Sequence, residues 1–319
     1  MERSTLRAVT IDAKEWNAKG KQFLKQAEAT SKGTTHNDRH ENIRFDTQQA
    51  HHLSLQSEIR LTLAAGEAFR IAGSWYESAK AYARAAQLST VSTSYLSSTD
   101  SHDSSMAASL YTEAGAVSEK LDINFANDYY KLAVTNHCND FEFKAAAMLL
   151  ERVANNFVGK GGLLASLEVF HRAWKLYDAA NEVDDADRIL ERYAYFLGRI
   201  GDLIESSNSY KTLALRQANR NTLIFNTPRY ALRSIVLYIA GKSNKFDMSE
   251  VQELIDEFCK HDCRLEESRE LQFIYDLMQS ISCSDLHKFA DCIYSLNEVT
   301  ELDDLLLDSL AKMQPQREE

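Results

Sequence analysis

Small and aromatic residues return in the same order at four places along this chain. Each block spaces a small or apolar residue, an aromatic residue and a further small or apolar pair three positions apart: Ala79-x-x-Tyr82-x-x-Ala85-Ala86, Ala126-x-x-Tyr129-x-x-Leu132-Ala133, Leu167-x-x-Phe170-x-x-Ala173-Trp174 and Ser207-x-x-Tyr210-x-x-Leu213-Ala214. The aromatic residue recurs after 47, 41 and 40 residues. This spacing places it on one helix face, and a repeat of about 40 residues is typical of stacked helical hairpins. We therefore expect an all-α solenoid with these four aromatic residues in its core.

Polar and turn-forming residues predict where the helices begin and end. We expect a first amphipathic helix over residues 12–30, a polar loop over 31–42, and a helical hairpin over 53–88 with Gly73 at its turn. Residues 89–105 contain eight serines and three threonines, which predicts a flexible surface insertion. That insertion also accounts for the longer first interval between repeats.

The helical pattern resumes at Met106, with turns expected near residues 121–122, 138–140, 159–162, 181–184 and 198–202. A longer connection over 219–228 precedes helices over 229–239 and 249–260, and residues 265–313 read as three helices in a tighter bundle. The predicted organisation is an N-terminal helix and loop (1–52), a helical-hairpin array (53–260), and a C-terminal helical bundle and tail (261–319).

Composition agrees with a mostly helical protein in a reducing compartment. The 319 residues include only two prolines and eleven glycines, and 44% are hydrophobic. No apolar run approaches the length of a membrane span, and the charged N-terminus does not resemble a secretory signal. Five cysteines, an odd number, favour free thiols in the cytoplasm. The net charge of −11 disfavours general binding to nucleic acid, because an acidic surface repels phosphate.

Candidate chemistry is sparse along the chain. Cys259, His261 and Cys263 lie close together, but a zinc site needs about four convergent ligands, and no second pair stands at a suitable spacing. A histidine-rich patch comprises His36, His40, His51 and His52, and we interpret it as a solvated polar loop. A zinc-dependent enzyme that uses either group of residues is therefore the weakest functional hypothesis for this sequence, behind the two binding functions described below.

Loops and carboxylates give no catalytic motif either. The stretch Gly159-Lys160-Gly161-Gly162 lacks the order of a phosphate-binding P-loop, and no strand is predicted before it. The pairs Asp184-Asp185 and Asp303-Asp304 sit in polar surroundings, which would not raise the pKa of one carboxyl for acid-base chemistry. The sequence predicts no enzyme, no metal and no cofactor.

Several short motifs resemble those of one known protein family in their order and spacing. Ala114-Gly115 with Lys120, Asp122 and Ala126 is similar to a family hairpin, and Ala186 to Ala194 to a later helix. Tyr230-x-x-Arg233 stands where the family has Y-x-x-K, and Ser268-Arg269-Glu270 matches its S-R-E. Residues 289–313 resemble its C-terminal segment, with Leu302-Asp303 as the L-D pair. Taken together over about residues 63–313, these motifs resemble the soluble NSF attachment proteins, and within that family the alpha type.

The resemblance implies a TPR-like twisted sheet of helical hairpins, capped by a C-terminal bundle. It implies a cytoplasmic adaptor that lays a basic concave face on the four-helix SNARE bundle and recruits the hexameric ATPase NSF, which disassembles the bundle during vesicle traffic. Membrane contact would be peripheral and indirect, through the SNARE proteins. Acidic SNARE bundles would be steered electrostatically by the basic face, and salt would weaken the contacts.

Individual functional residues follow only by analogy with the family. The positions that match its SNARE-facing cations are Lys120, Arg188, Arg192, Arg233 and Arg269. For each of these five residues, an ordinary solvated surface charge is an equally good interpretation. The segment implied to face the ATPase contains Leu302, Asp303, Leu306 and Leu310. Its leucines equally fit the core of the bundle.

The chain departs from the family pattern at several positions. Met148 stands where the family has a SNARE-facing lysine, and Gln279, Ser282 and Cys283 stand where it has glutamates that approach NSF. Leu305 replaces a tryptophan, the acidic extension with a penultimate leucine is not found, and residues 31–42 lack the aromatics of the membrane-touching loop. These departures favour, as the alternative, a degenerate adaptor or other helical-repeat scaffold that binds a partner without stimulating the ATPase.

Overall fold

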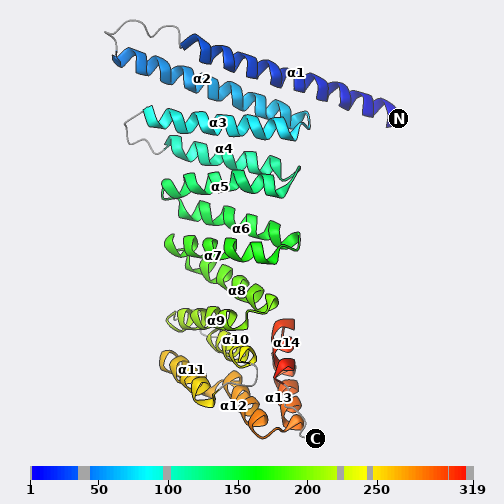
Figure 1. The fold of residues 1–319 in the computed structure, drawn as a ribbon, viewed down its shortest axis with the longest axis vertical. Coiled ribbons are helices and arrows are strands. Elements are labelled where there is room, and N and C mark those ends of the chain that lie inside the picture. Colours follow the sequence, from blue (N-terminus) through cyan, green and yellow to red (C-terminus); the bar gives the residue numbers. More distant parts are fainter. Residues whose placement is uncertain are drawn as a thin grey trace. The chain divides into compact units, whose positions relative to one another are not determined.

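The structure is a computed structural model that describes residues 2–34, 44–95, 102–220, 226–242, 247–300 and 302–313. These residues form fourteen α-helices and one short 3-10 helix, and they contain no strand (Figure 1). The predicted all-α class is confirmed. The chain forms two compact units, Met1–Asn156 with Ala179–Asn181, and Phe157–Asp178 with Glu182–Glu319. The expected domain boundaries at 52/53 and 260/261 stay predictions.

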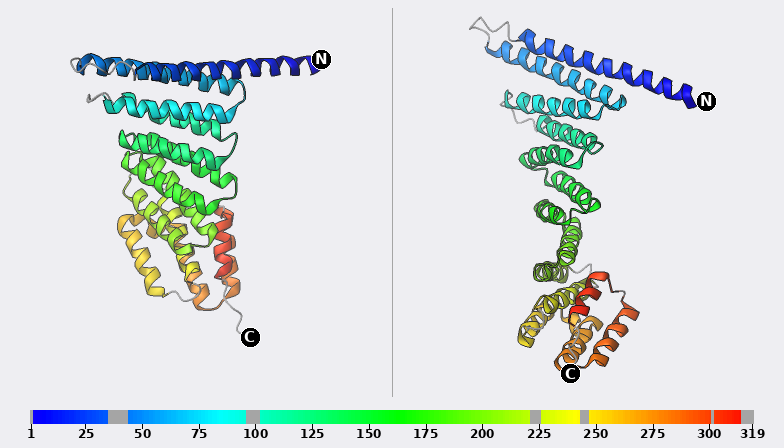
Figure 2. Two further views of the ribbon diagram at one scale, coloured as in Figure 1. Left: turned by 45° about the horizontal axis from the view of Figure 1, so that its top comes forward. Right: turned by 45° about the vertical axis from the view of Figure 1, so that its right-hand side comes forward.

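The first unit is a stack of antiparallel helices in which each helix from α2 to α5 packs on its predecessor (Figures 1 and 2). Its helices are α1 (Glu2–Thr34), α2 (Arg44–Ile71), α3 (Trp75–Tyr95), α4 (His102–Ser118), α5 (Ile123–Asn139) and most of α6 (Phe143–Gly159). The predicted turn at Gly73 is present between α2 and α3. Its φ of 73° lies in the left-handed region, which glycine adopts without strain.

The serine- and threonine-rich stretch differs from the prediction. Helix α3 continues to Tyr95 and α4 begins at His102, so only residues 96–101 of the expected insertion lie outside the described residues. Ser89 and Ser92 are buried, and Ser92 Oγ lies 3.1 Å from Nδ1 of His52 on α2. A serine is small enough for a helix interface, and its hydroxyl finds a partner there, so a serine-rich segment can remain helical.

The loop and histidine predictions near the N-terminus are partly corrected as well. Residues 31–34 belong to α1, while residues 35–43, including His36 and His40, lie outside the described part of the chain. His51 and His52 lie on α2 rather than in a loop, and His52 Nε2 is 2.8 Å from Nε2 of Gln56.

The repeated aromatic residues are core residues in three of the four blocks. Tyr82, Phe170 and Tyr210 are buried, as predicted. In the second block the prediction was wrong by one position. Tyr130 is buried, whereas Tyr129 is half-buried and packs edge-on against Phe125, with ring centroids 5.3 Å apart. The buried residue follows Ala126 by four positions instead of three, and both spacings lie on one helix face.

A glycine in α4 makes room for the Tyr130 ring. A Cβ atom on Gly115 would lie 2.5 Å from that ring, closer than any real contact. We expect Gly115→Ala to lower the free energy of unfolding by about 1 kcal/mol, because overpacking outweighs the gain in helix propensity. Gly159→Ala is the matched control. A Cβ there meets nothing within 4 Å, so its urea midpoint should stay equal or rise. Equal midpoints for the two variants would show that α4 and α5 adjust without cost.

Glu119, at the end of α4, joins three helices. Its carboxylate accepts hydrogen bonds from the Tyr130 hydroxyl (2.7 Å), from Arg152 Nη2 (2.8 Å) and from Asn156 Nδ2 (2.7 Å). Burial raises the pKa of Glu119, but the hydrogen bonds from Arg152, Tyr130 and Asn156 outweigh it, so the pKa is lowered. The carboxylate therefore holds α4 against α5 and α6.

The lowered pKa predicts an acid-sensitive contribution to stability. A carboxyl whose pKa is lower in the folded state contributes its full stabilisation above its ordinary, unfolded pKa, and this contribution disappears as the pH falls through the folded pKa. We expect Glu119→Gln to destabilise the protein at pH 7 and to have progressively less effect toward pH 3. Urea midpoints measured across that range test this, and a constant difference would contradict it.

The second unit centres on helix α10. Its helices are α7 (Leu163–Ala179), α8 (Val183–Ile200), α9 (Leu203–Ala218), α10 (Asn226–Gly241), α11 (Met248–His261), η1 (Cys263–Glu267), α12 (Arg269–Ser282), α13 (Leu286–Val299) and α14 (Asp304–Lys312). Helix α10 contacts α9, α11, α12 and α14 and is buried on nearly every side. One core extends from Leu190 to Met313. The predicted three-helix C-terminal segment is present as α12–α14.

A buried carboxylate fastens α9 to α8. Asp187 is 5% exposed and accepts hydrogen bonds from Arg216 Nε (2.6 Å), Gln217 Nε2 (2.7 Å) and Arg220 Nη1 (3.1 Å). Arg220 also pairs with the exposed Asp184, at 2.7 Å. The last turn of α9 is thereby tied to the first turn of α8.

Candidate functional site

Two of the predicted basic residues lie on one face of α8, because positions four apart share a helix face. Arg188 is exposed and its Nη2 lies 2.8 Å from Oδ1 of Asp185, one turn earlier. Arg192 is half-buried, with its guanidinium carbon 4.8 Å from the centre of the Phe170 ring on α7. Both arginines are charged groups within reach of a partner at the surface of the second unit.

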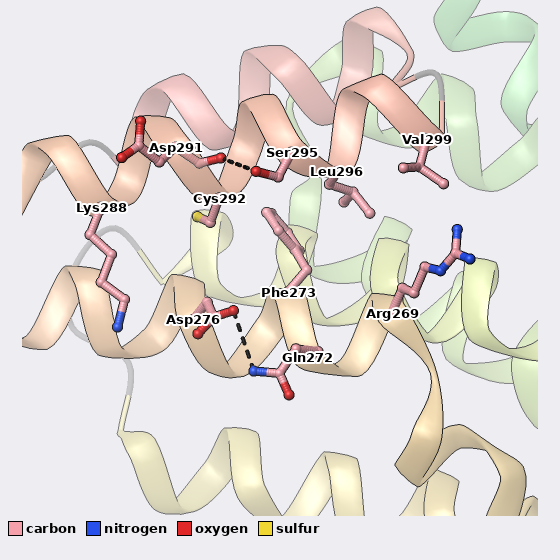
Figure 3. Close-up of a pocket in the computed structure, with 10 residues that line it drawn as sticks. All are labelled: Arg269, Gln272, Phe273, Asp276, Lys288, Asp291, Cys292, Ser295, Leu296 and Val299. Atoms are coloured by element: carbon pink, nitrogen blue, oxygen red, sulfur yellow. Dashed lines mark hydrogen bonds between the residues drawn. The ribbon is translucent and has the colours of Figure 1, made fainter.

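Arg269 is exposed at the start of α12 and lines a cleft of about 380 Å³ between α12 and α13 (Figure 3). Helix α12 contributes Arg269, Gln272, Phe273 and Asp276. Helix α13 contributes Lys288, Asp291, Cys292, Ser295, Leu296 and Val299. Ser268 caps α12 by accepting a hydrogen bond from the Leu271 N–H at 3.2 Å, which fixes where the helix begins and so places Arg269 at the mouth of the cleft.

The cleft is apolar in the middle and charged at its ends. Phe273 and Leu296 are nearly buried at its floor, while Val299 is 59% exposed at the same end as Arg269 (Figure 3). Burial raises the pKa of the Cys292 thiol, which is half-buried. Of these ten residues, sequence reasoning had selected only Arg269. The recurrence of lining residues at three- and four-residue steps on both helices is the signal that could have found the rest.

The predicted outward position of Arg233, facing SNARE proteins, is corrected by the structure, because its side chain points into the second unit. Its side chain is only 7% exposed, and Nη1 lies 2.6 Å from Oδ2 of Asp303 and 3.5 Å from the Tyr210 hydroxyl. Burial opposes the charged form, but the neighbouring Tyr210 and Asp303 outweigh it and raise the pKa of Arg233. Helix α10 is buried on nearly every side, so an arginine on one of its buried faces needs a partner inside the protein.

The residues expected to face the ATPase are also engaged inside the second unit. Leu302, Leu306 and Leu310 are all buried in its core. Asp303 pairs with Arg233 and caps α14, because its Oδ1 accepts a hydrogen bond from the Leu306 N–H at 3.0 Å. Of the two alternatives given for these leucines, the structure supports a place in the core of the second unit. Leu305, which replaces the family tryptophan, packs against Gly198 of α8.

Lys120 belongs to the first unit. It lies in the turn between α4 and α5, directly after Glu119, and its side chain is exposed. Its backbone N–H donates to the carbonyl of Val117 at 3.2 Å, which holds the turn. Met148, at the position of a family lysine, is 57% exposed on α6.

The cysteines and histidines that were candidates for a metal site show no metal-binding arrangement among the described residues. Within the described ranges, no three histidine, cysteine or acidic residues come together in a way that could hold a metal ion. Cys259 lies on α11 and Cys263 in η1, and both thiols are free. Burial raises the pKa of Cys259. Among the described helices, none combines the length and the apolar character needed to cross a membrane.

A family comparison decides the identity of this arrangement. The model of the family "Soluble NSF attachment protein, SNAP" matches residues 54–316, most of the chain. The chain belongs to the soluble NSF attachment protein family. This confirms the resemblance carried by the sequence motifs. Membership of the SNAP family supports a general role as an adaptor that acts with SNARE proteins and NSF, rather than as an enzyme.

Individual relatives of this SNAP protein are distant. It is 20% identical to an alpha-soluble NSF attachment protein from Vitis vinifera over 239 residues, which cover 75% of this chain and 78% of that protein. Two solved structures are similar at lower levels. The crystal structure of BtubC (BKLC) from P. vanneervenii has a TM-score of 0.33 at 9% identity and covers 80% of this chain and 93% of that one. The DHF58 filament has a TM-score of 0.23 at 16% identity, with 81% and 98% covered.

Proposed function

We propose that this SNAP-family protein binds assembled SNARE complexes and recruits an NSF-like ATPase for their disassembly. The family match over residues 54–316 carries the proposal. The protein would act in vesicle traffic as a cytoplasmic adaptor that reaches membranes through its SNARE partners. It would need neither a metal nor a cofactor and would not contact nucleic acid.

Exposed cations support the SNARE-binding step. Lys120, Arg188 and Arg269 are exposed and Arg192 is half-buried, so each can approach the acidic surface of a helical bundle. Such contacts steer and orient a partner more than they add affinity, and salt screens them. Arg233 is left out of the proposed surface, because its charge is used inside the unit.

Capture of an assembled SNARE bundle on beads, at low and at high salt, tests the first step. We expect binding at low salt and clear weakening at high salt, because exposed charges are screened within about 10 Å at 0.1 M. Absence of binding at low salt would overturn the proposal. ATPase recruitment is tested separately, by adding NSF and ATP and following the loss of the assembled bundle.

Charge reversal at Arg188 should weaken SNARE binding about tenfold at low salt, a change of about 1.4 kcal/mol in binding free energy. Lys131→Glu is the matched control. Lys131 is also exposed, it pairs with an aspartate three residues earlier, and it is not among the five cations predicted above to face SNARE proteins. Dissociation constants for Arg188→Glu and Lys131→Glu give the comparison. Equal weakening by both variants would indicate a general charge effect and remove Arg188 from the surface.

The internal engagement of the expected ATPase-facing residues favours a second candidate function. With Leu302, Leu306 and Leu310 buried and Asp303 paired, the segment offers less to a partner than the resemblance implied. Gln279, at a family glutamate position, accepts a hydrogen bond from Lys288. The protein would then bind SNARE complexes without stimulating the ATPase. Disassembly at the rate given by a standard alpha-type adaptor would exclude this candidate.

A further inference from the structure

The cleft between α12 and α13 has the length of a helix-binding groove. Its lining on α13 runs from Lys288 to Val299, eleven residues apart, which is about 16 Å of helix. On α12 it runs from Arg269 to Asp276, two turns apart. Two neighbouring helices that expose a shared groove over two to three turns form the surface into which an amphipathic helix can lay its apolar face.

Apolar groups are left uncovered along this groove. Val299 is 59% exposed at its edge, and Cys292 is half-buried beside the floor formed by Phe273 and Leu296 (Figure 3). An occupant that covers these side chains would remove apolar surface from water, at about 25 cal/mol for each Å². The occupant must therefore present apolar side chains of its own.

The charges along the groove are ordered. Arg269 lies at the Val299 end, and the guanidinium makes no ion pair or side-chain hydrogen bond with any residue that the structure describes. Asp291 and Lys288 lie at the opposite end, with Asp276 between (Figure 3). The Lys288 ammonium donates to the neutral Gln279 and keeps its charge, and Asp276 accepts a hydrogen bond from the neutral Gln272 at 3.3 Å. With two carboxylates against one ammonium, this end has an excess of negative charge, which favours a cation. The groove thus complements an acidic group at one end and a basic group at the other.

We propose that this groove binds one amphipathic helix of a partner protein, with an acidic residue toward Arg269 and a basic residue two turns away toward Asp276 and Asp291. The apolar residues between them lie against Phe273 and Leu296. This goes beyond docking of the assembled SNARE bundle, because a four-helix bundle keeps its apolar stripes inside. The occupant is a single helix with its stripe exposed.

A synthetic alanine-rich helix serves as the probe, with a glutamate, leucines three and four residues later, and a lysine seven residues after the glutamate. The readout is the rate of iodoacetamide alkylation at each cysteine of the full chain, followed by mass spectrometry. We expect Cys292 to react about tenfold more slowly at 90% occupancy, since only the empty fraction reacts. The exposed Cys263 and Cys283 lie outside the groove lining and should react at unchanged rates.

Two altered peptides and two protein variants test whether the apolar and charged groups of the peptide and of the groove are needed for binding. Replacing both leucines by serine should abolish the protection, and placing lysine at both charged positions should weaken it. Val299→Asp and Asp276→Lys should each reduce protection while leaving the circular dichroism spectrum unchanged, because Val299 is exposed and Asp276 is half-buried. Both variants should still capture the SNARE bundle, because neither replaces one of the proposed SNARE-facing cations, and this separates the present proposal from the proposed adaptor function.

Three outcomes would overturn the proposal. The first is an unchanged Cys292 rate at saturating peptide. The second is equal slowing of Cys263 and Cys283, which would mean non-specific coating. The third is protection by dodecanoate but not by the peptide, which would identify the cleft as a site for a small amphiphile instead of a helix.

Discussion

Replacement of Asp303 by alanine is expected to lower the free energy of unfolding of the second unit by about 3–5 kcal/mol. The Arg233 guanidinium is nearly buried and has its 2.6 Å contact with Asp303 as its strongest interaction. Without the carboxylate, the charge would keep only its contacts with Tyr210 among the described residues, the hydroxyl at 3.5 Å from Nη1 and the ring, whose centre lies 5.5 Å from the guanidinium carbon. The variant also removes the cap of α14, a loss of about 1 kcal/mol.

Two further variants separate the ion pair from the cap. Asp303→Asn keeps a capping oxygen but removes the charge, so it should retain most of the destabilisation. Asp285→Ala removes a cap alone, because among the described residues the exposed Asp285 carboxylate accepts only the Lys288 N–H at the start of α13, and the variant should lose about 1 kcal/mol. Urea unfolding followed by Trp174 fluorescence, with Trp16 and Trp75 replaced by Phe, reports on the second unit. Equal losses for Asp303→Ala and Asp285→Ala would show that the buried pair adds no net stability.

Local features of the fold could be predicted because short-range physics sets them. A glycine in the left-handed region ends α2, and the polar turns at 121–122 and 198–202 separate helices at the expected places. Three of four repeat aromatics were placed correctly in the core. Tyr129 was wrong because two adjacent tyrosines both fit helical spacing, and only the position of Gly115 on the neighbouring helix selects Tyr130.

Features that depend on distant partners could not be predicted. Arg233 meets Asp303 seventy residues later, so each one alone looks like a surface charge. The polar stretch with Ser89 and Ser92 looks like a loop until α2 supplies His52 as a partner. Helix phase alone does not decide whether a cation meets a partner protein or its own core. The candidate site was therefore only partly predicted, with Arg188 and Arg269 exposed and Arg233 buried.

Replacement of Asp187 by alanine should destabilise the second unit by about 3 kcal/mol, for a reason that the sequence did not reveal. Asp187 and the cations that bind it are about 30 residues apart, on different helices. Its carboxylate is the hydrogen-bond acceptor for Arg216 Nε and for the buried Gln217 amide, and it shares Arg220 with Asp184. Removing a buried acceptor leaves buried donors unsatisfied, and this loss exceeds the net gain from an ordinary hydrogen bond.

Asp184→Ala provides the matched control, because it removes a carboxylate from the same arginine at the surface. Asp184 is 83% exposed and lies 2.7 Å from Arg220, so water and salt already screen the pair, and its loss should change the unfolding free energy by less than about 1 kcal/mol. Both variants unfold in urea with Trp174 as the reporter, at low and at high salt. The Asp187 effect should persist at high salt, since a buried pair is screened little, and the small Asp184 effect should vanish. If high salt instead removed the Asp187 effect, the contact between α8 and α9 would be a surface ion pair, and the buried carboxylate would not be what holds these helices together.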